Sequence, residues 1–122
     1  MVESFTPGPL AAAACLTPQE AAPRLAEFRV VDVREPTEFH DALGHVAPAE
    51  LVPLASLAAV AAHWRRSQPL LVICRSGGRS GRAAAWLRAQ GFATTDLAGG
   101  MLAWHQAGLP VCDRAPCRRG PS

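Results

Sequence analysis

The chain has 122 residues, which fits one domain with one hydrophobic core. Apolar residues make up 49% and charged residues 18%, values typical of a folded globular protein, so a disordered chain is excluded. The net charge is only +2, which is too low to indicate nucleic acid or an acidic membrane surface as a partner. The chain contains arginine but no lysine.

Targeting signals are weak in this sequence. No run approaches the roughly 18 apolar residues that span a bilayer, so no membrane is expected. The N-terminus has no basic residue before Leu10, which makes a poor signal peptide, and a lipoprotein-type cleavage before Cys15 lacks the same charged start. We therefore expect a cytoplasmic protein with reduced cysteines.

The first half of the chain predicts short alternating elements. Residues 1–14 form a flexible leader, and a domain over 15–112 follows. Thr17 caps a helix with Pro18 at its first position and Glu20 three residues after the cap. That helix runs to about Glu27, interrupted or limited by Pro23. The further expected elements are a strand over 29–33, one or two helical turns over 37–43, a strand over 50–53 and a helix over 56–66 capped by Ser56.

The second half continues the alternation. An apolar strand over 70–74, buried on both faces, precedes a helix over 79–90 that ends at Gly91. A strand over 94–97 and a helix over 101–107 complete the domain, and residues 113–122 form a flexible, Arg-rich tail. Strand and helix alternate throughout, so the fold class is α/β with a parallel sheet.

The loop after the central strand concentrates the chemistry. Cys74 ends the strand, and the adjacent Gly77 and Gly78 permit positive φ angles and a close backbone approach. Ligands collect at the carboxyl ends of parallel strands, where loop N–H groups and a helix N-terminus favour an anion. We expect a reactive, exposed thiolate in an anion cradle. The alternative for Cys74 is a buried core thiol.

Charged and hydroxyl side chains surround this cysteine. Arg75 and Arg79 are expected to attract an anionic donor; the alternative for them is a solvated basic face. Ser76 and Ser80 either donate to the cradle or, in the case of Ser80, cap the helix.

Two residues at the end of a neighbouring strand complete the candidate site. Asp32 and Arg34 are candidates for the pocket rim. The structural alternative is an ion pair of Arg34 with Glu35, Glu38 or Asp32. His45 is expected to fix a loop by hydrogen bonding rather than to transfer a proton.

The remaining cysteines and tryptophans have plainer interpretations. Cys15 is expected in or beside the sheet. Cys112 and Cys117 are read as incidental thiols of a frayed tail, because no second ligand pair or nearby histidine completes a zinc site. Trp86 and Trp104 are expected in the core or at a pocket rim.

From about Leu16 to Val111 the chain resembles the single-domain rhodanese-like sulfurtransferases. Four segments in this order carry the resemblance: Val31-Asp32-Val33-Arg34-Glu35-Pro36-Thr37-Glu38-Phe39; Gly44-His45-Val46 with Val52-Pro53-Leu54; Cys74-Arg75-Ser76-Gly77-Gly78-Arg79-Ser80; and Gly99-Gly100-Met101-Leu102-Ala103-Trp104 with Gly108-Leu109-Pro110-Val111. Pro48 departs from the pattern, since the family commonly has glycine about there.

The resemblance implies a three-layer α/β/α fold with a five-stranded parallel sheet. It also implies that Cys74 takes sulfur from thiosulfate or a persulfide donor, becomes a persulfide and passes the sulfur to cyanide or a thiol. The donor would be bound by Arg75, Ser76, Gly77, Gly78, Arg79 and Ser80. No metal or organic cofactor is implied.

Three other functions remain open. A persulfide relay receiving sulfur from a protein shares the same chemical step, and a non-enzymatic partner-binding module shares the fold. Phosphatases and arsenate reductases of this fold hold five residues between the cysteine and an arginine. Here four residues separate Cys74 from Arg79, and the shorter loop favours a sulfur-sized group.

Overall fold

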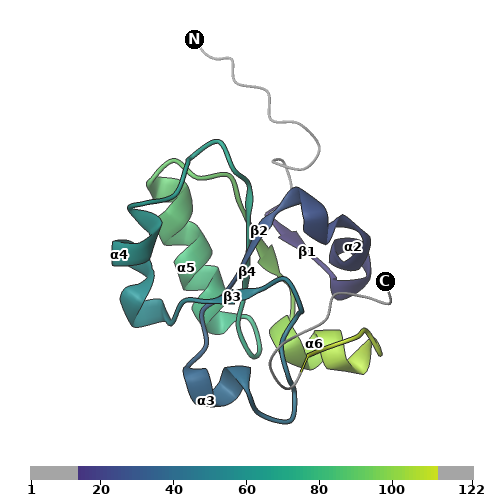
Figure 1. The fold of residues 1–122 in the computed structure, drawn as a ribbon. Coiled ribbons are helices and arrows are strands. Elements are labelled where there is room, and N and C mark those ends of the chain that lie inside the picture. The colour runs from purple at the N-terminus through teal and green to yellow at the C-terminus, as the bar shows by residue number, and fades with distance from the viewer. Residues whose placement is uncertain (1–13, 113–122) are drawn as a thin grey trace.

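A parallel five-stranded sheet forms the centre of the protein (Figure 1). The computed structural model describes residues 14–112; the tail expected at 113–122 and all but the last residue of the leader expected at 1–14 lie outside this range. The strand order is β1-β5-β4-β2-β3, and every pairing is parallel, as the alternation of strands and helices predicts. The strands are β1 (Cys15–Leu16), β2 (Arg29–Asp32), β3 (Glu50–Leu51), β4 (Leu70–Ile73) and β5 (Thr94–Leu97).

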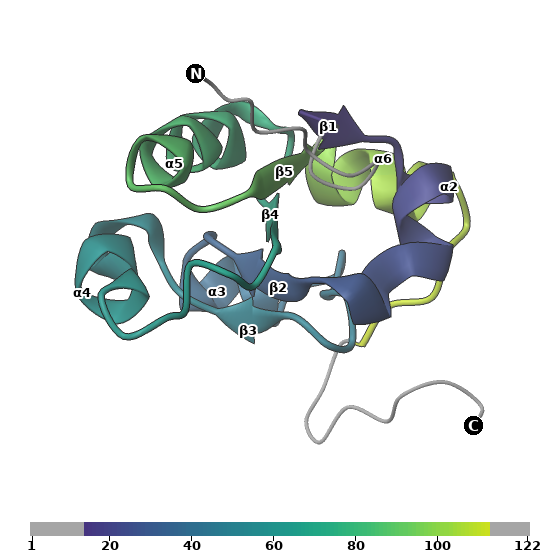
Figure 2. The same ribbon diagram turned by 90° about the horizontal axis from the view of Figure 1, so that it is seen from above.

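Helices cover both faces of this sheet, as expected for a three-layer fold. Figure 2 shows α4 and α5 on one side and α2 and α6 on the other. The helices are α2 (Pro18–Ala21), α3 (Pro36–Phe39), α4 (Leu57–Ala61), α5 (Gly78–Ala89) and α6 (Gly100–Gln106), with 3₁₀ segments η1 (Ala22–Glu27) and η2 (Leu54–Ser56). No helix within residues 14–112 is long and apolar enough to cross a membrane.

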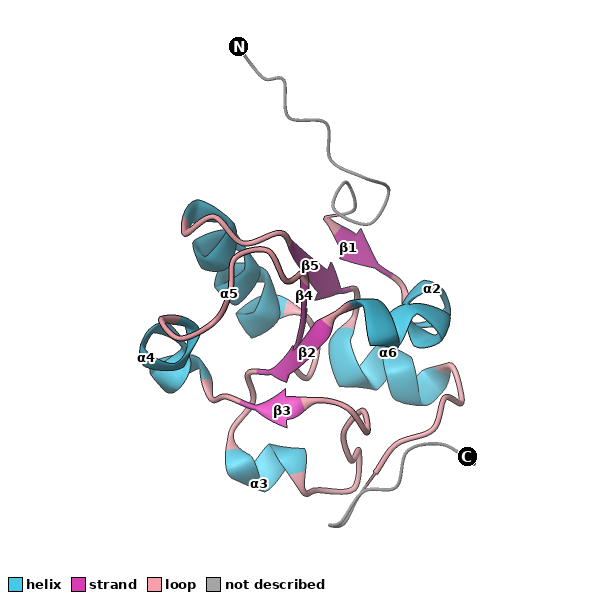
Figure 3. Ribbon diagram, turned by 45° about the horizontal axis from the view of Figure 1, so that its top comes forward, coloured by secondary structure: helices cyan, strands magenta, loops and turns pink. Residues whose placement is uncertain are grey.

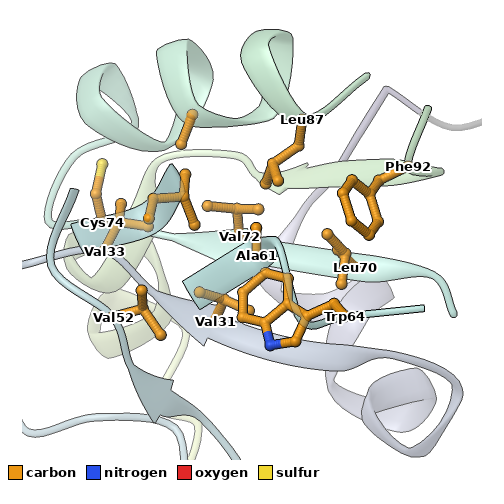
Figure 4. Packing of buried hydrophobic residues seen from close by; sticks show 12 residues of the cluster. Val31, Val33, Val52, Ala61, Trp64, Leu70, Val72, Cys74, Leu87 and Phe92 are labelled. Atoms are coloured by element: carbon orange, nitrogen blue, oxygen red, sulfur yellow. The ribbon is translucent and has the colours of Figure 1, made fainter. Parts of the chain in front are cut away.

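The central strand β4 is buried along its whole length because it has a paired strand on each side and helices on both faces. Successive side chains point to opposite faces. Leu70 and Val72 therefore join the cluster under α4 and α5, and Leu71 and Ile73 join the cluster under α2 and α6. Full burial of each such side chain stabilises the fold by roughly 1.5–3 kcal/mol. Figure 4 shows Leu70, Val72 and Cys74 on the first of these faces.

The first helix is interrupted before Pro23, as predicted, whereas the cap predicted at Ser56 does not form. Thr17 and Glu20 form the expected capping box, but the α-helical turn ends at Ala21 and continues as the 3₁₀ segment η1, because Pro23 has no N–H to donate. Ser56 makes no capping hydrogen bond with its side chain. Ser56 lies inside η2, where backbone hydrogen bonds hold the turn that precedes α4. One of them joins Ser56 N to Pro53 O at 2.7 Å.

Other elements are shorter than predicted. α3 stops at Phe39 rather than near residue 43, and α4 stops at Ala61 rather than Arg66. Beyond α4 the chain makes tighter three-residue turns, with Trp64 N bonded to Ala61 O at 3.0 Å. The strands over 70–73 and 94–97 and the long helix α5 agree with the prediction to within about one residue.

Aromatic and cysteine side chains bring three further outcomes. Trp104 is 1% exposed and belongs to the core, whereas Trp86 is 38% exposed, which excludes the core for Trp86. Cys15 lies in the edge strand β1, as expected. Cys112 is neither an incidental thiol nor frayed: it is disulfide-bonded, and its backbone forms an antiparallel bridge with His45. Cys117 lies outside the described residues.

Candidate functional site

The segment from Cys74 to Gly78 turns from the end of β4 into the start of α5, at the carboxyl edge of the sheet. The start of α6 holds this segment in place. Met101 N donates to Cys74 O at 2.9 Å, and Leu102 N donates to Arg75 O at 3.0 Å. The loop backbone is therefore fixed from below by a second helix, at the edge where ligands of parallel sheets bind.

The sulfur of Cys74 accepts a hydrogen bond from the backbone of its own loop. Gly77 N lies 2.9 Å from Cys74 Sγ. Gly77 has φ of +112°, a conformation that glycine adopts without strain, and it immediately precedes α5. An N–H donor and a helix N-terminus both favour negative charge on the sulfur.

Cys74 is buried, with 1% of the residue exposed, so the expectation of an exposed thiolate is wrong. Its side chain turns toward the layer that contains α5, where it shares a cluster with Val33 and Ala83 (Figure 4). The reason is alternation along β4: residue 74 continues the face of Leu70 and Val72 into the core. The loop residues Arg75, Ser76 and Gly78 are exposed above it.

Arg79 is already paired. Its Nη1 and Nη2 lie 2.7 Å and 2.8 Å from the two carboxylate oxygens of Glu38 in α3. The hydrogen bond from Arg79 holds the pKa of Glu38 down to about 2, against a smaller opposing effect of burial. The same bond raises the pKa of Arg79. The arginine expected to attract a donor is thus held by a carboxylate in this structure.

Ser80 fastens the loop to strand β5. Its residue is fully buried, and its hydroxyl donates a hydrogen bond to Asp96 Oδ1. The same hydroxyl oxygen lies 3.4 Å from Gly77 O. Burial raises the pKa of Asp96, and the Ser80 hydroxyl partly offsets that rise. The side chain of Ser80 therefore contacts Asp96 and Gly77, and it makes no capping bond to the N-terminus of α5.

Replacing Ser80 by alanine is expected to lower the free energy of unfolding by about 2 kcal/mol at neutral pH, because a partly buried carboxylate loses its donor. The Ser80 bond lowers the pKa of Asp96, so it stabilises only the ionised form. The loss should therefore diminish as the pH falls through the pKa of Asp96. Urea unfolding of the wild type and the variant at several acidic pH values measures this. A loss independent of pH would contradict it.

Asp32 and Arg34 form the ion pair that was the alternative to a place at the pocket rim. Both are fully buried, with Arg34 Nη2 at 2.8 Å from Asp32 Oδ2. Arg34 also donates to the carbonyl oxygens of Glu38 at 3.0 Å and Gly44 at 2.8 Å. The pair therefore fastens α3 and the following loop to the end of β2.

His45 holds that following loop, as expected. Its Nδ1 lies 2.8 Å from Phe39 O, its ring stacks on Phe39 at 3.7 Å between centroids, and its backbone pairs with Cys112.

Two residues that contact the site through side chains were not among the predicted site residues: Glu38 and Asp96. Asp96 carries one signal in the sequence, a carboxylate within a strand between Thr95 and Leu97.

Comparison with known proteins assigns the chain to a family. Residues 17–107 match the rhodanese-like domain. The chain belongs to the rhodanese-like domain family, as a single domain that covers most of its length.

Two curated relatives and one solved structure illustrate the range of similarity. The chain is 37% identical over 100 residues to thiosulfate sulfurtransferase 16, chloroplastic, of Arabidopsis thaliana, covering 71% of this chain and 82% of that protein. It is 36% identical over 86 residues to thiosulfate sulfurtransferase GlpE of Vibrio cholerae, covering 70% and 79%. A rhodanese-related protein of Thermoplasma volcanium superposes with a TM-score of 0.76 at 28% identity, covering 82% of this chain and 98% of that one.

The match is partial in length for other relatives. The chain spans about half of two of them: 45% of an uncharacterized protein of Synechocystis, at 40% identity over 83 residues, and 53% of rhodanese-like domain-containing protein 15, chloroplastic, of Arabidopsis thaliana. Relatives of this chain are thus named sulfurtransferases in some cases and uncharacterized in others.

Proposed function

We propose that this protein is a sulfurtransferase that moves sulfane sulfur from thiosulfate or a persulfide donor to cyanide or a thiol, through a persulfide on Cys74. The observation that supports it most directly is the hydrogen bond from Gly77 N to Cys74 Sγ. A backbone N–H held at this position stabilises negative charge on a thiolate, and it can stabilise the charge of a persulfide in the same way. The names of the relatives point in the same direction.

The proposed reaction has two balanced steps. The Cys74 thiolate attacks the outer sulfur of thiosulfate; a sulfur–sulfur bond to Cys74 forms, the bond to the sulfonate sulfur breaks, and sulfite leaves with its electron pair. Cyanide then attacks the outer sulfur of the persulfide and leaves as thiocyanate, which regenerates the thiolate. Arg75, Ser76, Gly77, Gly78 and Arg79 are the proposed donor-binding residues, whereas the buried Ser80, bonded to Asp96, supports the loop.

The burial of Cys74 adds a requirement to this proposal. A sulfur on a residue that is 1% exposed is out of reach of a donor until atoms of the overlying loop move aside. The exposed loop residues Arg75, Ser76 and Gly78 mark the side from which the donor approaches. Loading of sulfur therefore includes a local opening of the loop.

Mixing the purified protein with thiosulfate and weighing it intact tests the function. The wild type is expected to gain one sulfur atom and to lose it to cyanide as thiocyanate. Cys74→Ser should gain none, and Cys15→Ser serves as the matched control, because Cys15 is a free thiol in the distant edge strand β1. Thiocyanate release that survives Cys74→Ser would contradict the proposal.

A persulfide relay is the second candidate function, and the buried sulfur favours it, because slow access suits a group handed over by a docked protein. Sulfur loading with negligible turnover on cyanide would support the relay over the thiosulfate enzyme. A partner-binding module without chemistry predicts no loading at all. We propose the cytoplasm as the location; the thiols of Cys15 and Cys74 are free, whereas the disulfide at Cys112 departs from the reduced state expected for this compartment.

Phosphatase or arsenate reductase activity is the third candidate, and the structure offers it less support. Four residues separate Cys74 from Arg79, and the guanidinium of Arg79 is held by Glu38. Phosphate release from an aryl phosphate that depends on Cys74 would favour this activity instead.

A further inference from the structure

The cations around the loop are not equally available. Arg34 is paired with Asp32, and Arg79 is paired with Glu38 through both of its terminal nitrogens. Within residues 14–112, Arg75 and Arg82 have no ion-pair partner. The two cations that extend toward α3 are therefore neutralised by carboxylates, whereas those on the exposed loop and helix surface are not.

The pairing of Arg79 is positioned next to the reactive group. Arg79 follows Gly77, whose N–H bonds the sulfur, by two residues, in the first turn of α5. Figure 1 shows α3 and the start of α5 at the same end of the sheet. The pKa of Arg79 is raised mainly by its hydrogen bond to Glu38, with a smaller contribution from a charge on Cys74.

Glu38 is fixed in this position by backbone contacts on both sides. Its Oε1 accepts a hydrogen bond from Glu35 N at 3.0 Å, and its carbonyl accepts one from the buried Arg34 at 3.0 Å. Its side chain is 23% exposed, and its low pKa keeps it ionised throughout the neutral range. A permanent negative charge is therefore held against Arg79, two residues after the glycine whose N–H bonds the sulfur.

We propose that Glu38 is a specificity-determining residue that lowers the preference of the site for doubly charged donors by occupying Arg79. The inference rests on the proposed function and deepens it. Coulomb energy is proportional to the charge of the ligand, so one carboxylate near the sulfur penalises a dianion about twice as much as a monoanion. The site thus favours sulfane sulfur carried on singly charged or neutral molecules, such as a thiosulfonate or a persulfide, over thiosulfate.

The test compares two donors of the same chemistry and different charge, thiosulfate (a dianion) and methanethiosulfonate (a monoanion). Glu38→Gln removes the charge and keeps one oxygen, which can accept from Glu35 N and Arg79 Nη1, but it loses the acceptor for Arg79 Nη2. We expect kcat/KM to rise about tenfold for thiosulfate and about threefold for methanethiosulfonate, mainly through KM. Equal changes for the two donors, no change, or a decrease for thiosulfate would overturn the inference.

A matched control separates the position of the charge from the change in net charge. Glu35→Gln removes one negative charge from the cap of the same helix, and Glu35 makes no contact with Arg79. It is expected to change the two donor constants by less than about twofold. An effect of Glu35→Gln equal to that of Glu38→Gln would assign the change to net charge and overturn the role of Glu38.

A second measurement does not depend on sulfur transfer. In a Cys15→Ser background, intact mass follows alkylation of Cys74 by anionic iodoacetate and by neutral iodoacetamide. Glu38→Gln should raise the rate ratio of iodoacetate to iodoacetamide about threefold. If this ratio shifts although neither donor loads sulfur, the proposed function fails and the charge selectivity stands. An unchanged ratio, or no alkylation by either reagent, would overturn the selectivity.

Discussion

Replacing Arg34 by methionine is expected to lower the free energy of unfolding by about 4 kcal/mol, because it leaves the Asp32 carboxylate buried without its cation. Arg34 and Asp32 are both fully buried, and the guanidinium reaches the two carboxylate oxygens at 2.8–2.9 Å. The substitution also removes the donors for the Glu38 and Gly44 carbonyl oxygens. A loss of this size is a large part of the total stability of a small domain.

Urea unfolding measures this loss, and two further variants keep the result interpretable. Arg34→Lys keeps the charge but not the fork of donors, so we expect a smaller loss of about 2 kcal/mol from a protein that still folds. Arg24→Met breaks the more exposed pair with Glu27 and should cost less than about 1 kcal/mol. Equal losses for Arg34→Met and Arg24→Met would show that the buried pair contributes no more to the free energy of unfolding than the more exposed pair.

Gly100→Ala is the second substitution with a large expected effect, about 3–4 kcal/mol of destabilisation. A Cβ at residue 100 would overlap Cys74 O and would lie 2.7 Å from both the carbonyl carbon and the oxygen of Arg75. All three are backbone atoms and cannot rotate away. Gly100 also has φ of +58°, which disfavours any residue with a Cβ.

Two glycines serve as controls for the separate contributions at Gly100. Gly108 has φ of +73°, and a Cβ added there would meet nothing within 4 Å, so Gly108→Ala isolates backbone strain, expected at about 1 kcal/mol. Gly78 has neither a positive φ nor a close neighbour, so Gly78→Ala should be nearly neutral. Gly100→Ala should also slow sulfur loading of Cys74, since α6 supports the loop. An effect no greater than that of Gly108→Ala would contradict the proposed close contact.

The parts of the fold that the sequence could predict are those decided by local patterns. An apolar run at Leu70–Ile73, a capping box at Thr17 and Glu20, and a glycine after α5 each specify their structure within a few residues. The parallel sheet follows from their alternation. The break at Pro23 was predicted, but the end of α4 at Ala61 was not, because the tighter turns that follow α4 carry no breaker residue of their own.

The site was predictable in its residues but not in their partners. The position of Cys74 and Gly77 in one loop follows from the order of strand, glycines and helix. The burial of Cys74 follows from alternation along β4, whose two faces are both covered, whereas the pairing of Arg79 with Glu38 joins residues 41 positions apart. Such contacts depend on how α3 and α5 pack, which no local pattern encodes. The pair of Asp32 and Arg34, two residues apart, was open to prediction and was the stated alternative to a place at the pocket rim.

The outer strands of the sheet determine how readily two copies of this protein could pair edge to edge. β1 and β3 contain two residues each (Figure 3), so the rows of unpaired backbone groups along the two rims of the sheet are very short. A long open rim recruits strands from other molecules and seeds aggregation. Strands this brief give a second molecule almost nothing to extend, so concentrated solutions of the protein are expected to resist fibril growth through its sheet.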